Sequence, residues 1–276
     1  MGKHVRLLHL EQNNRNSKLR RRARFNDFLK GAGPMVIGAL MGAGIAQPAQ
    51  AQAVNLDIQS NNIIADGRTR TNIDTQGKHT KITTETVSGD VGFNSFTDFQ
   101  QAAGTRVDLF VPDGADNLLN IVTDGTVLIN GELNGFKNGE IGGNIFFSSS
   151  NGFIVGQNGT VNVGSLSVNT PTGEFLERVI RADGTIDNGV AHQLMTGEVP
   201  MSANGHIAIM GEVNAQGGIT LQGRNVSINS STGALVGDDL SQRMKFDSTV
   251  NASDVVEGAA LLSYGGKIAI VAEGET

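Results

Sequence analysis

Carboxylate side chains are the groups in this sequence whose type and spacing could do chemistry. Asp183, Asp187 and Asp238 lie in polar segments, and Asp113 and Asp116 form a spaced pair. Enzymes that cleave acidic polysaccharides on a β-helix use carboxylates on one solenoid face, with calcium or a nearby base. The structural alternative is that an Asp at a turn bonds its own backbone. Asp183, which glycine follows, fits that alternative directly.

Other catalytic patterns are absent from the sequence. It contains no cysteine, no phosphate-binding G-x-x-x-x-G-K-[ST], no H-E-x-x-H and no G-x-S-x-G. The histidines after residue 53 are single and far apart, which is typical of surface or capping residues: His79, His192 and His206. We therefore predict a protein that is not an enzyme and that uses no cofactor and no metal ion.

The charge is unevenly divided along the 276 residues. Residues 1–53 hold nine Lys and Arg against two Asp and Glu, a net charge of +7. The remaining 12 basic and 25 acidic residues give residues 54–276 a net charge of −13. An acidic domain repels a phosphate backbone, so nucleic acid is not an expected partner.

The first 53 residues have the order of an export signal. A basic cluster at 18–24 precedes an uncharged apolar run at 35–46, and small residues follow. The run is too short to span a bilayer, which takes about 20 residues. Cleavage is expected after Ala51 or Ala53, following export by the Sec machinery. The alternative is a basic surface helix followed by a buried one.

Residues 54–276 contain many short segments in which apolar and polar residues alternate, as half-buried strands require. Asn-Gly and Asp-Gly dipeptides separate them. Inward apolar residues recur at short steps through 205–237, which favours a β-solenoid over a sandwich. Helical composition at 172–181 and, more weakly, at 190–195 predicts short excursions from the solenoid wall. A first strand is expected at 54–58.

Residues 142–168 carry the most specific pattern. This segment resembles the secretion domain of filamentous-haemagglutinin-type adhesins of two-partner secretion, with the nearest likeness to the leukotoxin-like filamentous adhesins. The hallmark of that family is Asn-Pro-Asn-Gly followed by Ile or Val. Here Asn151 and Gly152 match, Phe153 is an apolar replacement, and Ser149 and Ser150 depart from Asn-Pro.

The resemblance implies a right-handed parallel β-helix that is exported through the periplasm in unfolded form. It also implies recognition by an outer-membrane Omp85-type transporter with periplasmic receptor domains. In the family, recognition lies in this domain and includes the Asn-Gly turn. The chain would then be secreted or displayed on the outer surface of a Gram-negative cell.

We therefore expect a signal peptide at 1–53 and a β-helical secretion domain at 54–276. The leading hypothesis is the N-terminal secretion domain of an adhesin that mediates cell adhesion through a host-cell or matrix ligand. The alternatives are a secreted β-helix polysaccharide lyase or hydrolase, and a purely structural surface or biofilm protein. We find no unbroken line of Asp, Lys or Arg at coil spacing that would favour the enzyme.

Overall fold

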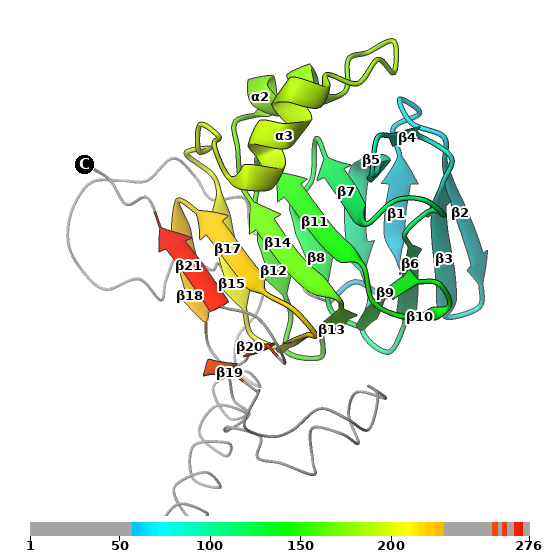
Figure 1. Ribbon diagram of the computed structural model, residues 1–276. Helices are drawn as coiled ribbons and strands as arrows, with labels where there is room; N and C mark the ends of the chain where they lie inside the picture. The colour runs from blue at the N-terminus through cyan, green and yellow to red at the C-terminus, as the bar shows by residue number, and fades with distance from the viewer. Residues whose placement is uncertain (1–56, 229–255, 259–260, 264–267, 273–276) are drawn as a thin grey trace, which may run out of the picture. The chain divides into compact units, whose positions relative to one another are not determined.

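The computed structural model describes residues 57–228, 256–258, 261–263 and 268–272. The expected signal segment 1–53, with Ala51 and Ala53, lies outside the described residues. The strands of the remaining part stack mostly in parallel, coil upon coil (Figure 1). The predicted all-β, parallel β-helical fold is therefore confirmed.

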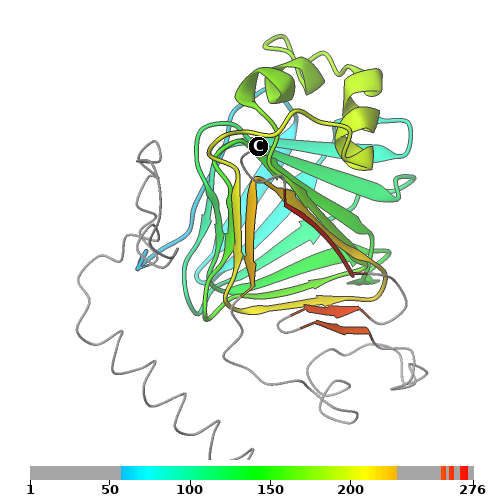
Figure 2. The same cartoon turned by 90° about the vertical axis from the view of Figure 1, so that its left-hand side faces the viewer.

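Each coil contributes strands to three faces, which Figure 2 shows end-on. The first face contains part of β5 (Val91–Gln101), then β7 (Asn117–Val122), β11 (Asn144–Ser149), β14 (Ser165–Asn169), β17 (Ile219–Gly223) and β21 (Ile268–Ala272). The second face contains the end of β5, then β8 (Val127–Ile129), β12 (Phe153–Val155), β15 (His206–Ile209) and β18 (Asn225–Ile228). The third contains β3 (His79–Thr84), β6 (Arg106–Phe110), β9 (Glu132–Lys137), β13 (Thr160–Val163), β16 (Glu212–Ala215) and β20 (Leu261–Ser263).

The N-terminal coil carries antiparallel strands. β1 (Asn62–Ala65) and β4 (Val87–Ser88) pair with β5, and β2 (Thr71–Gln76) forms a hairpin with β3. The short strands β10 (Glu140–Ile141) and β19 (Val256–Gly258) pair antiparallel with β9 and β20. The strand predicted at 54–58 is wrong for its described part, because residues 57 and 58 are irregular and the first strand starts at Asn62. An antiparallel partner satisfies the edge of the first coil, which is otherwise open to pairing with another chain.

The core is a continuous column of inward-facing side chains, as the alternating pattern predicted. Four phenylalanine rings follow one another along the corner between the first and second faces. Phe96 and Phe99 meet edge to face at 5.2 Å, Phe99 meets Phe147 at 5.2 Å, and Phe147 meets Phe153 at 5.5 Å between ring centroids. Such pairs contribute about 0.5–1.5 kcal/mol each beyond the burial of their area.

Asparagine ladders join successive coils. On the third face, Asn134 donates to Asp108, Asn162 donates to Asn134, and Asn214 donates to Asn162, at 2.9–3.1 Å. Inside the helix, Asn94 donates to the fully buried Asn120 at 3.0 Å. Because buried amides without partners cost about 1–3 kcal/mol each, these ladders fix the register of the coils they join.

The two predicted helical excursions are confirmed as α2 (Gly173–Val179) and α3 (Asn188–Thr196). They lie over the outside of the first face (Figure 2) and interrupt the coil between β14 and β15. Their apolar side chains form one buried cluster with outward residues of β5 and β7: Val91, Phe93, Leu119, Ile121, Phe175, Leu176, Val179, Ile180, Val190, Ala191 and Leu194. This second core explains why the outer side of these strands is apolar.

Candidate functional site

The segment predicted to be the secretion motif, Ser149 to Phe153, turns the chain from β11 on the first face to β12 on the second. The backbone N–H of Gly152 donates to the carbonyl of Ser149 at 3.4 Å, which closes a four-residue turn. The Ser149 hydroxyl also accepts from the backbone N–H of Asn151 at 3.2 Å. The motif is thus a corner of the β-helix.

This turn is stacked on the corresponding corner of the preceding coil. Asn151 Nδ2 donates to the Asp124 carbonyl at 2.7 Å, and Ser149 Oγ donates to the Gly125 carbonyl at 2.9 Å. In the other direction, Thr126 Oγ1 donates to the Asn151 carbonyl at 2.8 Å. The side chains that define the motif are therefore engaged in holding two coils together.

Gly152 occupies the tightest position of the turn. Its φ is +105°, a conformation that L side chains rarely adopt. A Cβ atom there would lie 2.4 Å from the carbonyl oxygen of His206 in the next coil. Phe153 follows with 1% of its surface exposed and belongs to the aromatic column of the core. Ser150 and Asn151 are only half-buried, so they are the motif residues that face the surface.

His206 lies beside this corner, because β15 pairs with β12. Its Nδ1 contacts Asn225 Nδ2 at 3.1 Å. Burial lowers the pKa of His206, and the charge of Arg224 lowers it further. Its partner is the side-chain amide of Asn225, and this contact supports a structural role.

The described candidate catalytic carboxylates bond to backbone groups of their own turns. Asp183 accepts the backbone N–H of Thr185 at 2.9 Å, and this hydrogen bond lowers the pKa of Asp183. Asp187 caps α3 by accepting the backbone N–H groups of Gly189 and Val190 at 3.1 Å. Asp238 lies outside the described residues. Turn and cap roles therefore account for the two described residues.

The spaced pair Asp113 and Asp116 precedes β7. Asp116 forms an ion pair with Lys137. Within the described residues, no group of three or more His, Cys, Asp or Glu could hold a metal ion. Among the helices of the same part of the chain, none is long and apolar enough to cross a membrane.

One charged cluster was missed by sequence reasoning. Asp108 is 3% exposed and accepts from Arg106 Nε at 2.8 Å and Asn134 Nδ2 at 3.0 Å, while His79 Nε2 lies 2.7 Å from its other oxygen. Burial opposes ionisation of Asp108, but hydrogen bonds from Arg106, Asn134 and His79 outweigh it and lower its pKa. Arg106 lies two positions from Asp108, but His79 and Asn134 lie 29 and 26 positions away, so only the coil register brings these two to Asp108.

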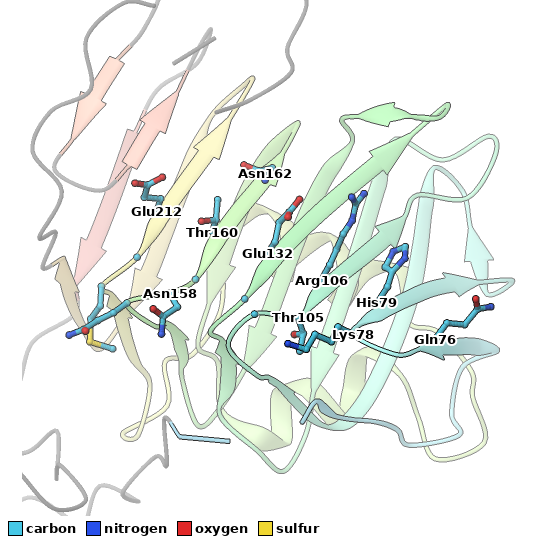
Figure 3. A pocket seen from close by; sticks show the side chains of 16 residues that line it. Gln76, Lys78, His79, Thr105, Arg106, Glu132, Asn158, Thr160, Asn162 and Glu212 are labelled. Atoms are coloured by element: carbon cyan, nitrogen blue, oxygen red, sulfur yellow. The ribbon is translucent and has the colours of Figure 1, made fainter. Parts of the chain in front are cut away.

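A groove of about 840 Å³ opens beside this cluster on the outside of the third face (Figure 3). Its wall is a row of residues in register, one for each coil: His79, Arg106, Glu132, Thr160 and Glu212. Charged and polar side chains therefore do form a line at coil spacing. The line was not visible in the sequence, because the coils differ in length and its members are unevenly spaced along the chain.

The comparisons with known proteins agree with this architecture. A family model described as "TPS secretion domain" matches residues 61–275, which is most of the β-helical part. A search of curated proteins found no significant match. The matched range contains the motif turn, the helical excursion and the outer groove.

Proposed function

We propose that this chain, which belongs to the family of TPS secretion domains, is the secretion domain of a filamentous adhesin that an Omp85-type transporter carries across the outer membrane. Family membership makes the chain a substrate of two-partner secretion, and the family is one of secretion modules rather than of enzymes. The single observation that carries the finer proposal is the family match over residues 61–275.

Export in unfolded form suits the composition of the chain. It has no cysteine, so no disulfide can lock it in an oxidising periplasm. Its stability rests on contacts between neighbouring coils, and coils that contact only their neighbours can fold one after another. A chain that emerges from a narrow barrel can therefore fold outside the cell as each coil arrives.

The antiparallel N-terminal strands support a direction for this folding. β1 and β4 cover one side of β5, while β7 adds to the other side in parallel. Arg68 reinforces this end through Asp66 at 2.7 Å and Ser95 Oγ at 2.9 Å. In the proposed mechanism, this first coil is the template on which later coils add in parallel, starting with β7 on β5.

The motif turn would act within this mechanism by forming a corner. The side chains of Asn151 and Ser149 donate hydrogen bonds to the preceding coil, and Gly152 and Phe153 are buried. We infer that residues 149–153 contribute to secretion chiefly through folding of the emerging coils. Recognition by the transporter would then rest on a longer part of the unfolded chain.

The proposed partner can be tested by direct binding. The chain without residues 1–53 would be diluted from denaturant onto the immobilised periplasmic domains of the cognate transporter. We expect saturable binding that disappears once the chain has folded. Equal binding by an unrelated unfolded acidic chain of similar length would overturn specific recognition, as would the absence of any binding.

A further inference from the structure

Glycines from three successive coils line the outer groove. Gly131, Gly159 and Gly211 lie directly before Glu132, Thr160 and Glu212 in successive coils and line the groove. A Cβ atom on any of the three would lie 2.2–2.4 Å from a backbone carbonyl oxygen of a neighbouring segment. Close packing of the coils thus requires glycine here. The groove crosses the strands along the direction in which the coils stack.

Along the groove, anionic side chains alternate from coil to coil with side chains that are cationic or neutral. Arg106 on β6 is cationic, Glu132 on β9 is anionic, Thr160 on β13 is a neutral hydroxyl and Glu212 on β16 is anionic. Lys78 extends the cationic end, His79 lies next to it, and Asn158 stands beside Thr160 (Figure 3). Side chains that suit an anionic group of a ligand therefore alternate with side chains that suit a hydroxyl donor, and neighbouring positions lie about 4.8 Å apart.

The lining excludes two other classes of ligand. Among the described residues that line it, Met210 is the only large apolar side chain, so a compact apolar molecule would bury little apolar surface there. An extended peptide that adds a strand needs a free sheet edge. β6, β9 and β13 each have a strand on both sides, so no free edge lies along this part of the groove. The terminal strand β2 reaches the lining only through Gln76, its last residue. The groove therefore suits a polar, elongated ligand that lies across the strands.

From this alternation we propose that the groove binds an extended glycan of alternating anionic and neutral sugar units. A carboxylate of the glycan would meet the Arg106 guanidinium, and the next one would meet Thr160 and Asn158, two coils apart. Hydroxyl and amide groups of the neutral units would donate to the carboxylates of Glu132 and Glu212. A uniformly anionic polymer would instead place negative charge against both glutamates, at a cost in like-charge repulsion.

The glycan would be the ligand of the proposed adhesin. Its biological role rests on the proposed function, whereas its binding to the groove does not. Binding is measured on the purified chain without residues 1–53, whose core clusters use no residue before Ile63. No transporter is involved, so failure of binding and failure of secretion are separate results. Circular dichroism would first establish that each protein is folded.

The probe is a hyaluronan hexasaccharide, in which glucuronate and N-acetylglucosamine alternate, titrated by calorimetry. Hexamers of galacturonate and of N-acetylglucosamine are the uniformly anionic and the neutral comparisons. We expect the alternating hexamer to bind at least about tenfold more tightly than either. Equal or tighter binding of a comparison hexamer, or no binding of the alternating one, would overturn the proposal.

Two variants locate the site. Thr160→Glu places a third carboxylate in the row and is expected to weaken binding of the alternating hexamer about tenfold or more. Thr220→Glu makes the same change at an exposed position of β17 on the first face and should leave binding unchanged. Lys78→Ala is compared with Lys81→Ala in the same way. If Thr160→Glu leaves binding of the alternating hexamer unchanged, the glycan site at this groove is refuted.

Discussion

Gly152 and the carbonyl of His206 approach each other so closely that a Cβ atom on Gly152 would lie 2.4 Å from that oxygen. The contact joins the motif turn to the coil that resumes after the helical excursion, across a gap of more than fifty residues in the sequence. It explains the glycine of the Asn-Gly pair through packing between coils as well as through turn geometry.

Gly152→Ala should therefore destabilise the β-helix by about 2–4 kcal/mol, through the close contact and the positive φ together. Gly139→Ala is the matched control, because Gly139 has a φ of +86° but nothing within 4 Å of its Cβ position. It should cost only about 1 kcal/mol. Urea unfolding followed by circular dichroism measures both. Similar losses for the two variants would show that the contact with His206 contributes nothing.

Asn151→Ala tests whether the motif acts through folding. Loss of the 2.7 Å hydrogen bond to Asp124 should cost about 1 kcal/mol of unfolding free energy. Ile219→Val, at a fully buried position of β17, should cost a similar 0.5–1.5 kcal/mol without touching the motif. We expect the two variants to lower the secreted amount equally. A much larger loss for Asn151→Ala would mean that the transporter reads this side chain directly.

The asparagine ladder makes a prediction for Asn162. Asn162→Ala leaves the Oδ1 of Asn134 and the Nδ2 of Asn214 without their partners. Two buried polar groups without partners should cost about 2–4 kcal/mol. Asn72→Ala, on the exposed side of β2, should change stability by less than about 0.5 kcal/mol. Equal midpoints of chemical unfolding for these variants would argue against the ladder as a source of stability.

Asp108 should make stability depend on acidity. Its pKa is lowered in the folded chain, below the ordinary value of 3.8, so its charged form stabilises the fold above that pH. This contribution disappears as the pH falls through the folded pKa. The stability difference between the wild type and Asp108→Asn should be constant above pH 3.8 and shrink below it. A difference that grows on acidification would contradict the hydrogen-bonded cluster around Asp108.

The strands, turns and excursions were predictable from local patterns. Ser165 to Val168 alternates polar and apolar residues, and β14 begins at Ser165 with Leu166 and Val168 inward. The helix at 173–179 was visible because Phe175, Leu176 and Val179 recur at helical spacing. In both cases the signal lies within a few residues, where backbone periodicity alone decides which side chains share a face.

Contacts between coils could not be predicted in the same way. Along the asparagine ladder of the third face, neighbouring members are separated by 26 residues between Asp108 and Asn134, by 28 between Asn134 and Asn162, and by 52 between Asn162 and Asn214. No fixed period aligns them, because corners differ in length and the excursion interrupts one coil. The cluster at Asp108 and the row that lines the groove depend on this register, so the structure was needed to find them.

Two-partner secretion of this chain can be tested in a Gram-negative host, with and without the co-expressed transporter. The culture medium would be probed for the chain that lacks residues 1–53, the expected signal segment, with a periplasmic marker protein as a control for leakage. We expect the processed chain to reach the medium or the cell surface only when the transporter is present. A processed chain that stays in the periplasm in both cases, or that reaches the medium without the transporter, would contradict this expectation.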